Sequence, residues 1–489
     1  MSEDEEQFIN IRNQATLSML GTFLDAAVSF VGLVLFANIL GAGGLGKFYV
    51  LLAIVKVSRF PLGGIGQAVM KRGSERNLNT ARFFGGGITY CVAYVTICGV
   101  ILLAIALIDT GLFPYDLKLV ATAFALFVVQ LFYHLSLDTY RSYGKTGYAG
   151  LIDNTLGILE TALQVVLLLT GFGVLGLLIG TIVTTTLVTI GLLIFSTVTV
   201  ARPDIDVLRS IWRYGRWSVI TSGLANVYDR LPLLLVGVFL GNDIAGYYTS
   251  ANRLLMLGSH VGSSIAPALM VRASASDSSA HDLSDLRLGM RYTTILALPL
   301  FFGSLALSNA LMVTAFGPTF AGTGPVLIGL AVYHIVNTYD TVTFSFFNGI
   351  NQPEKATKAT AIALGVLSVG SAVTVLHVGI LGVVTVVVFA HMVRVLVGEL
   401  MIREEFGRVV IPTSTVYQLA ASVPMFFVVV GLNRHIAITG WFRLFVVVGV
   451  GAVVYSVILL VLDQYLRGMV RTVLSEALVL VGFKFQSVW

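Results

Sequence analysis

Long apolar runs dominate the sequence, and short segments containing Gly, Pro or charged residues separate them. An α-helix needs about 20 predominantly apolar residues to cross a bilayer, and the runs of this chain approach or reach that length. Fourteen such runs can be placed, over residues 16–39, 47–69, 84–108, 118–138, 149–170, 174–197, 217–239, 245–270, 291–314, 325–347, 359–377, 379–401, 412–432 and 440–462. The pattern predicts an all-α integral membrane protein with about 14 transmembrane helices.

The composition excludes the usual soluble classes. Only 11% of the 489 residues are charged, against about 25% in a soluble protein. The chain contains no HExxH, GxSxG or zinc-spaced Cys/His motif, so we expect neither an enzyme nor a resident cofactor or metal. Its basic loops lack the length and the aromatic residues of a nucleic-acid surface, and we expect no nucleic-acid partner.

Lys and Arg are distributed unevenly between the two sets of connecting segments. With the N-terminus inside, 21 of the 30 lie in cytoplasmic segments and only four, Lys47, Lys118, Arg434 and Arg443, lie in outer ones. Because basic residues are retained on the cytoplasmic side, this asymmetry predicts a multi-pass protein of the cell membrane with both termini in the cytoplasm.

An internal repeat relates two parts of the chain at an offset of 200 residues. Leu40-Gly41, followed by Gly46, recurs as Leu240-Gly241, followed by Gly246, and AVMKRGS at 68–74 aligns with ALMVRAS at 268–274. Six spans separate the copies, so both enter the membrane in the same direction. Such parallel repeats are typical of secondary transporters. We expect an N-lobe of six helices over 1–210, a C-lobe of six over 211–401, and a C-terminal addition of two helices and a cytoplasmic tail over 402–489.

Five basic residues remain inside predicted spans: Lys56, Arg59, Arg230, Arg253 and Arg394. A cation near the bilayer centre costs at least about 2.5–3.5 kcal/mol, so each needs water or an acidic partner. Lys56 and Arg59 share one helix face, and Arg253 lies at a similar depth in the second copy of the repeat. We expect these three residues to line a cationic central cavity.

Arg230 directly follows Asp229 and precedes Pro232, which can kink or break its span. Two interpretations of Arg230 stay open at this point. Its side chain lines the cavity, or it pairs with Asp340 or Glu160.

The buried acids also allow two interpretations. Asp25 is either the ion-pair partner of Lys56 or a protonatable site that couples transport to an ion gradient. The same choice between ion coupling and charge pairing applies to Asp229, Asp340 and Glu160.

Three stretches resemble a known family: LGAGGLGKFYVLLAI after the first span, LGNDIAGYYTSANRLL after the seventh, and NQPEKA after the tenth. Together with fourteen spans, they resemble the polysaccharide or oligosaccharide-lipid flippases (O-antigen-flippase-like) of the multidrug/oligosaccharidyl-lipid/polysaccharide (MOP) exporter superfamily. The resemblance implies two six-helix lobes, alternating access, and movement of a lipid-linked sugar from the cytoplasmic to the outer leaflet. It also implies that cations on the second and eighth spans bind the lipid phosphate. In this chain those cations are Lys56 or Arg59 on the second span and Arg253 on the eighth. The first-span basic residues of similar flippases are missing, and the only central charge of that span is Asp25.

We therefore predict a flippase for a polyprenyl phosphate- or pyrophosphate-linked sugar or oligosaccharide, used in surface polysaccharide or glycoprotein biosynthesis. Its expected partners are this substrate, membrane lipids, the glycosyltransferases or polymerase of the pathway, and Na⁺ or H⁺ as coupling ion. One alternative is an ion-coupled multidrug antiporter on the same fold, for which acidic and aromatic walls would be favoured. Another is a non-transporting membrane scaffold for glycan assembly, in which buried charges serve only as ion pairs.

Overall fold

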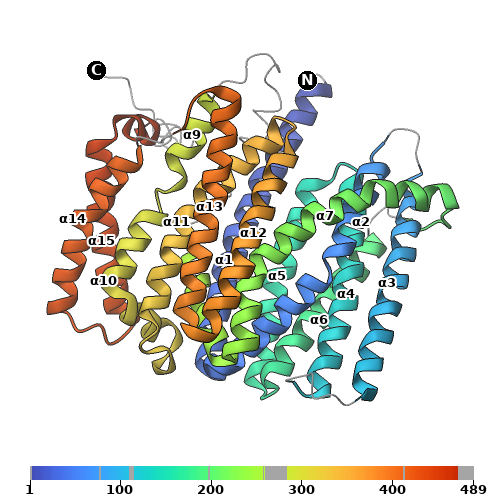
Figure 1. The fold of residues 1–489 in the computed structure, drawn as a ribbon, viewed down its shortest axis with the longest axis horizontal. Helices are drawn as coiled ribbons and strands as arrows, with labels where there is room; N and C mark the ends of the chain where they lie inside the picture. The colour runs from blue at the N-terminus through green and yellow to red at the C-terminus, as the bar shows by residue number, and fades with distance from the viewer. Residues whose placement is uncertain are drawn as a thin grey trace. The chain divides into compact units, whose positions relative to one another are not determined.

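The computed structural model describes residues 3–75, 79–108, 115–195, 199–256, 258, 283–410 and 414–471, and only the backbone of residues 3–20, 23, 284 and 285. Over these residues the secondary structure is helical, with no strand (Figure 1). Eleven of the described helices are long and apolar enough to cross a membrane. The expectation of an all-α, multi-pass membrane protein is confirmed.

The first half of the chain forms helices that match the first eight predicted spans. They are α1 (Glu3–Ser58), α2 (Phe60–Gly73), α3 (Thr80–Ile108), α4 (Leu117–Ser142), α5 (Thr146–Leu169), α6 (Gly173–Phe195), α7 (Ile205–Leu235), the π-helical η1 (Val236–Leu240) and a helix over 242–256. The eighth span was expected to extend to residue 270, and its part after 256 lies almost entirely outside the described residues.

The second half supplies the remaining six predicted spans. Its elements are α9 (Ser284–Thr293), α10 (Ala297–Phe316), the 3₁₀ turn η2 (Pro318–Phe320), α11 (Gly324–Gly349), α12 (Pro353–His377), α13 (Ile380–Phe406), α14 (Ser414–His435) and α15 (Trp441–Leu462).

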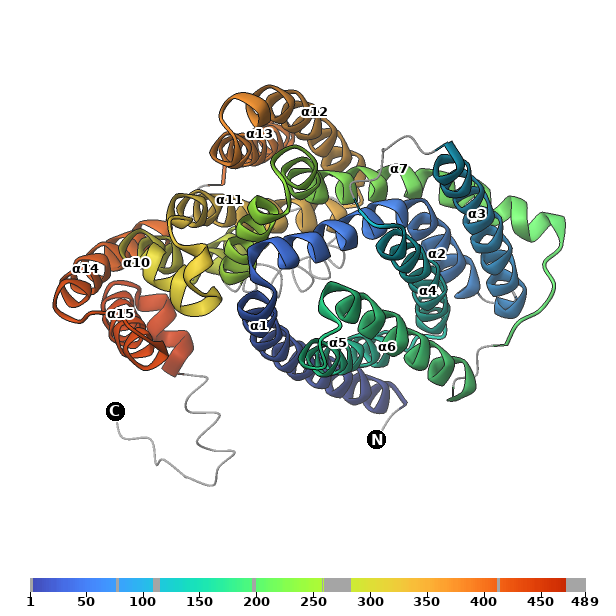
Figure 2. The same cartoon turned by 90° about the horizontal axis from the view of Figure 1, so that it is seen from below.

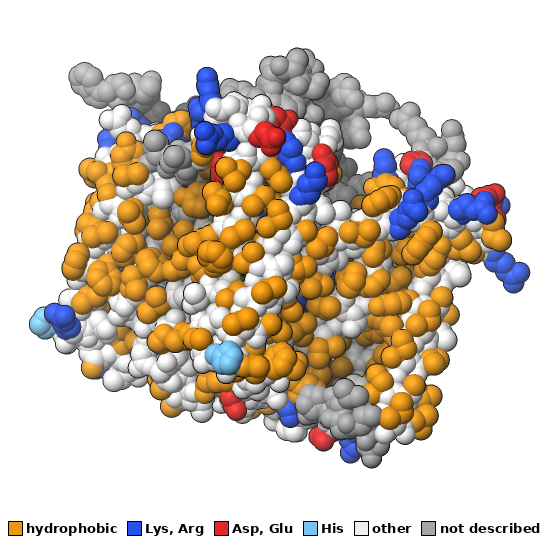
Figure 3. All heavy atoms as spheres, viewed as in Figure 1, with side chains coloured by type: hydrophobic (Ala, Val, Ile, Leu, Met, Phe, Trp, Pro, Cys, Tyr) orange, Lys and Arg blue, Asp and Glu red, His pale blue; other side chains and the backbone are white. Residues whose placement is uncertain are grey.

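Large apolar side chains are exposed along the spans, as expected of surfaces that face lipid. On α3, for example, Val92, Ile97 and Leu103 are each more than half exposed. On the face seen in Figure 3, hydrophobic side chains cover the flanks of the helices, and Lys and Arg gather near helix ends.

The chain divides into two compact units. Unit 1 comprises Met1–Ser250 with Ser368–Val383, and unit 2 comprises Ala251–Leu367 with Val384–Trp489. The lobe limits expected at residues 210 and 401 stay a prediction.

The repeat is visible in the backbone of unit 1. Gly41 kinks α1 with φ 68° and ψ −177°, and Gly241, which ends η1, has φ 93° and ψ 172°. Both conformations lie in the left-handed half of φ space, which glycine adopts without a steric penalty. The kink separates the first two predicted spans inside α1, just as Gly241 separates the seventh from the eighth.

The two copies of this turn pack against each other in a reciprocal contact. A Cβ placed on Gly46 would lie 1.8 Å from the backbone oxygen of Asn242, and a Cβ on Gly246 would lie 2.1 Å from that of Ala42. Because residues 242 and 246 are the repeat equivalents of 42 and 46, this is the self-complementary contact of a two-fold relation. The repeat inferred from the sequence is therefore matched by a reciprocal contact at this crossing, and its parallel direction stays a prediction.

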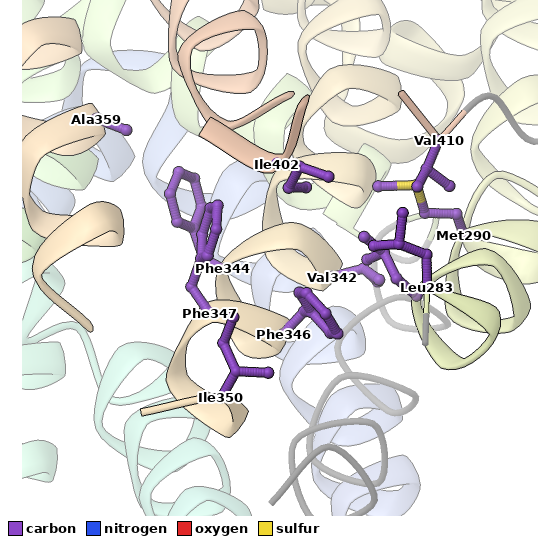
Figure 4. Close-up of a cluster of buried hydrophobic side chains, with 11 residues drawn as sticks. Leu283, Met290, Val342, Phe344, Phe346, Phe347, Ile350, Ala359, Ile402 and Val410 are labelled. Carbon is purple, nitrogen blue, oxygen red and sulfur yellow. The ribbon is translucent and has the colours of Figure 1, made fainter. Parts of the chain in front are cut away.

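Unit 2 contains an aromatic and aliphatic cluster that ties its helices together (Figure 4). Phe344, Phe346 and Phe347 of α11 are its largest members, and α9, α12 and α13 contribute Met290, Ala359 and Ile402. This packing fixes the position of α11 within unit 2 and, with it, the positions of the polar residues on that helix.

Candidate functional site

The second predicted span is broken at its centre. Helix α1 ends at Ser58, and α2 begins at Phe60 with Pro61 in its first turn. Proline has no backbone N–H to bond the Val57 carbonyl four residues earlier. The Leu62 N–H bonds the Arg59 carbonyl rather than that of Ser58, and the Ser58 carbonyl accepts a hydrogen bond from the Tyr94 hydroxyl at 2.8 Å. The break puts Lys56 in the last turn of α1 and Arg59 at the N-cap of α2.

Helix α2 packs against both α4 and α7 (Figure 2). A cavity of about 660 Å³ lies beside the break, and all of its lining residues belong to unit 1. This volume falls in the range of about 300–1,000 Å³ that is typical of small-ligand sites. The charged and polar side chains of its wall include Lys56, Arg59, Gln67, Lys71, His134, Asp138, Arg141 and Asn226.

Arg59 is the most unusual of these residues. Its Nη1 atom is buried and has no hydrogen-bond partner among the described residues. Asp138 and Asp153 attract the guanidinium electrostatically, and Arg230 repels it. Buried polar atoms are almost always satisfied, so an unsatisfied guanidinium nitrogen on a cavity wall indicates a site for an anionic ligand.

A network of charges supports the opposite wall on α4. Arg141 pairs with Asp138 at 2.9 Å and with Asp153 at 3.7 Å. Asp153 also accepts the Tyr133 hydroxyl at 2.7 Å. Gly66 leaves room for Asp138, because a Cβ at that position would lie 2.4 Å from Asp138 Oδ2. The absence of a side chain at residue 66 therefore lets α2 and α4 approach closely at the cavity.

The structure places the predicted pair Lys56 and Arg59 together on the cavity wall. Arg230 is half-buried on α7, near enough to act on Arg59, but it is not among the lining residues. Asp229 is exposed. Arg253 is half-buried on the helix over 242–256 and belongs to unit 2. That Arg253 joins Lys56 and Arg59 in one central cavity stays a prediction.

Asp25 of α1 faces α5, and Glu160 of α5 faces α6. The Asp25 carboxylate accepts the Ser29 hydroxyl at 3.3 Å and faces Gly157, where a Cβ would lie 2.1 Å from its Oδ1. Glu160 accepts hydrogen bonds from Gln164 Nε2 at 3.1 Å and from Thr181 Oγ1 at 2.9 Å. Both acids lie apart from the cavity wall, since neither lines the cavity.

Asp340 has a different partner from those considered above. It forms an ion pair with Arg394 at 2.8 Å, and the side chains are only 3% and 14% exposed. The Arg394 guanidinium also lies 4.3 Å from the centre of the Phe344 ring. These contacts describe a buried pair within unit 2.

Five residues that line the cavity were not among the site residues predicted from the sequence: Gln67, His134, Asp138, Arg141 and Asn226. A signal existed for three of them, because His134, Asp138 and Arg141 are spaced at i, i+4 and i+7 and so share one helix face. The predicted span ended at Asp138, which placed Arg141 in a loop, whereas α4 continues to Ser142.

Unit 2 contains a second cavity of opposite character. Its volume is about 560 Å³, and it is lined almost entirely by apolar residues of α10, α14, α15 and the segment after α15. One helical turn before Ile295 of its wall, Arg291 pairs with Asp463 at 3.1 Å. The guanidinium of Arg291 lies 4.2 Å from the centre of the Tyr465 ring. The cavity therefore combines an apolar wall with a neutralised charge close to it.

Comparisons with known proteins agree with this architecture. The family model described as "Polysaccharide biosynthesis protein" matches residues 37–325. A probable low-salt glycan biosynthesis flippase, Agl15 of Haloferax volcanii, is 24% identical over 460 residues, covering 90% of this chain and 94% of the relative.

Solved structures show the same fold. The lipid II flippase MurJ in an inward closed conformation superposes with a TM-score of 0.77 at 15% identity, covering 92% of this chain and 99% of MurJ. An inward-facing multidrug resistance MATE transporter of the MOP superfamily superposes with a TM-score of 0.58 at 17% identity, covering 78% of this chain and 94% of the transporter. The chain therefore has the MOP-type fold, as predicted.

Proposed function

Because the chain belongs to the polysaccharide biosynthesis protein family, we propose that it is a flippase for a lipid-linked sugar or oligosaccharide. It moves this substrate from the cytoplasmic to the outer leaflet of the cell membrane by alternating access, with both termini in the cytoplasm. The single observation that carries the proposal is the cavity beside Arg59, whose buried Nη1 lacks a partner among the described residues. The name of its Haloferax relative, a glycan biosynthesis flippase, supports the same function.

The cationic wall can replace the hydration that the substrate's phosphate loses when it leaves water. A phosphate or pyrophosphate cannot cross hydrocarbon unaided, whereas its polyprenyl tail is stable there. Arg and Lys bind phosphate through charge-assisted hydrogen bonds, which are stronger where water is excluded. We assign this role to Lys56 and Arg59 and propose that Arg230 and Arg253 add to the same positive field.

The apolar cavity in unit 2 fits the other end of such a molecule. Its wall is formed by side chains such as Leu307, Met425 and Val429, which can contact an isoprenoid chain without desolvating polar groups. Membrane lipids and the substrate's tail are its proposed occupants.

Release outside requires a second conformation that holds the headgroup less tightly. We propose that Na⁺ or H⁺ binding at Asp25 and Glu160 biases this change, because both carboxylates lie at helix interfaces beside polar groups, Asp25 between α1 and α5 and Glu160 between α5 and α6. Asp229 is exposed and Asp340 is paired with Arg394, so they are weaker choices for coupling. The glycosyltransferases or polymerase of the same pathway are the proposed protein partners.

The test uses the full-length protein in proteoliposomes with a fluorescent polyprenyl phosphate sugar. The wild-type protein is expected to make the inner-leaflet fraction accessible to an outside quencher, and Arg59→Gln is expected to lose this activity. A drug efflux activity without any sugar-lipid movement would overturn the proposal in favour of a MATE-type exporter. Full activity of both Lys56→Gln and Arg59→Gln would show that the cationic wall has no transport role.

In the source organism, deletion of the gene is expected to accumulate lipid-linked glycan on the cytoplasmic leaflet. Rescue by variants in which these cations are neutralised would instead favour a scaffold that does not transport.

A further inference from the structure

The cavity wall contains one acid among its cations. Lys56, Arg59, Lys71 and Arg141 line the cavity together with a single carboxylate, that of Asp138. Asp138 stabilises the cations of the wall, since it pairs with Arg141 and attracts Arg59. A carboxylate on the cavity wall also repels an anion at close range, so its position there indicates a further contact with another part of the ligand.

Neutralisation of Arg141 does not account for Asp138. Arg141 already has a second carboxylate, that of Asp153, at 3.7 Å. Asp153 is fixed by the Tyr133 hydroxyl and does not line the cavity, whereas Asp138 does. Arg141 thus holds Asp138 Oδ1 at 2.9 Å and orients the carboxylate at the cavity edge.

Three other polar side chains of the cavity wall can exchange hydrogen bonds with hydroxyls, besides the bonds that Gln67 accepts from Ser218 and that Asn226 donates to the Ser222 carbonyl. His134 lies one helical turn before Asp138 on the same face of α4, and Gln67 of α2 and Asn226 of α7 complete the polar lining. Amides and imidazoles both donate and accept hydrogen bonds, and a carboxylate accepts from O–H donors through short, charge-assisted bonds. A ligand that combines an anionic group with several hydroxyls satisfies this set, and a bare phosphate does not.

We propose that Asp138, with Gln67, His134 and Asn226, forms a subsite for the hydroxyl groups of the first sugar, next to the phosphate site at Lys56 and Arg59. The carboxylate makes this subsite selective for an uncharged sugar, because an acidic sugar would place a second carboxylate beside Asp138. The inference rests on the proposed function and specifies the substrate class of the same cavity. A volume of about 660 Å³ holds the phosphate and the sugar nearest to it, so longer glycans extend out of the cavity.

The experiment measures binding to the purified full-length protein in nanodiscs. Three probes share one polyprenyl chain: the bare phosphate, the phosphate carrying one neutral hexose, and the phosphate carrying one hexuronic acid. The wild-type protein is expected to bind the hexose probe most tightly. Asp138→Asn is expected to weaken hexose binding by about tenfold, to leave the bare phosphate unchanged or slightly tighter, and to reduce the discrimination against the hexuronic acid.

Asp153→Asn is the matched control, since it removes the other carboxylate from Arg141 without altering the cavity wall. It is expected to keep the order of the three probes, and thermal denaturation verifies that both variants fold. Equal weakening of all three probes by Asp138→Asn, or an equal effect of the two variants, would overturn the subsite. Arg59→Gln reports separately on the phosphate site: unchanged binding of the bare phosphate in that variant would refute the proposed function instead.

Discussion

Arg59 and Arg394 both carry guanidinium groups buried within membrane-spanning helices, and their surroundings differ in kind. Arg394 is neutralised by Asp340 at 2.8 Å and covered by the Phe344 ring. Arg59 faces a cavity, and its Nη1 has no hydrogen-bond partner among the described residues. The charge of Arg394 is compensated by an acid at ion-pair distance, whereas Arg59 has no such ion pair among the described residues and lines a cavity. Burial alone therefore does not identify a functional cation in a membrane; whether an acid pairs with it is the better guide.

The two cavities extend this comparison to the two units. The unit 1 cavity has charged and amide side chains on its wall, and the unit 2 cavity is almost entirely apolar. A polar headgroup and an isoprenoid tail require these two kinds of surface. Substitutions at the two arginines and at four glycines test this contrast.

Replacing Arg394 is expected to damage the fold. Arg394→Ala leaves Asp340, only 3% exposed, as an uncompensated buried charge, and losing one partner of a buried ion pair costs about 3–5 kcal/mol. Thermal denaturation in detergent measures the loss. The double variant Arg394→Leu/Asp340→Leu is expected to recover most of the stability, and its failure to do so would assign the pair a role beyond neutralisation.

Replacing Arg59 is expected to damage function instead. Arg59→Gln removes the charge that binds the phosphate, and hydrogen bonds to charged groups contribute about 1.5–3 kcal/mol, so phosphate-dependent transport should fall about tenfold to a hundredfold. Stability should stay constant or rise, because an unsatisfied buried group is removed. A variant that unfolds like Arg394→Ala would erase the distinction between the two arginines.

Two glycines, Gly46 at a tight helix crossing and Gly63 on the cavity wall, are expected to differ in how an added side chain changes stability. Gly46→Ala places a Cβ 1.8 Å from the Asn242 oxygen, and such crowding costs about 1–3 kcal/mol. Gly63 lines the cavity and has no atom within 4 Å of an added Cβ, so Gly63→Ala is expected to be neutral in denaturation experiments. Equal stability of the two variants would contradict the reciprocal crossing at Gly46 and Gly246.

The smallest effect is expected in the apolar cavity. Gly303 lines it, and an added Cβ there meets no atom within 4 Å, so Gly303→Leu narrows the cavity without disturbing the helix packing. Transport of a long-tailed substrate should fall a few-fold, and that of a short-tailed one should not change. Gly449→Leu on α15 is the control, because Gly449 is equally unobstructed and lies outside the lining. Identical behaviour of both variants with both tails would exclude a tail site in this cavity.

Much of the fold was predictable because hydrophobic length and glycine placement are local properties. The apolar runs located the long helices that the structure describes, eleven of which can cross a membrane, and the turns at Gly41 and Gly241 carried the repeat in both sequence and conformation. The break at Ser58 was not predicted, although Pro61 marked it, since a proline is tolerated in a membrane helix where neighbouring groups satisfy the backbone around it. Here the Tyr94 hydroxyl of α3 bonds the Ser58 carbonyl at the break, and sequence order does not disclose that contact.

Only one wall of the candidate site, the one that carries Lys56 and Arg59, was predictable from the sequence. The cost of burying charge singled out Lys56 and Arg59, but the opposite wall of α4 was missed. His134, Asp138 and Arg141 form a polar stripe that reads as the end of a span, and it becomes a cavity wall because Gly66 allows α2 to pack closely against it. Ion pairing was equally inaccessible from the sequence, because Arg394 of α13 pairs with Asp340 of α11, a helix that is not adjacent to it in the chain.

Residue order alone was enough to predict that this chain crosses the membrane many times, that its spans repeat in parallel, and that a few buried cations need polar surroundings. These conclusions follow from transfer free energies and residue spacing, which act along the chain. Which of those cations are neutralised and which face a cavity became visible only once the helices were seen packed together. That outcome depends on which helices meet, and contacts a few ångströms long between distant residues determine whether a buried charge is satisfied within the protein or is left to bind a ligand.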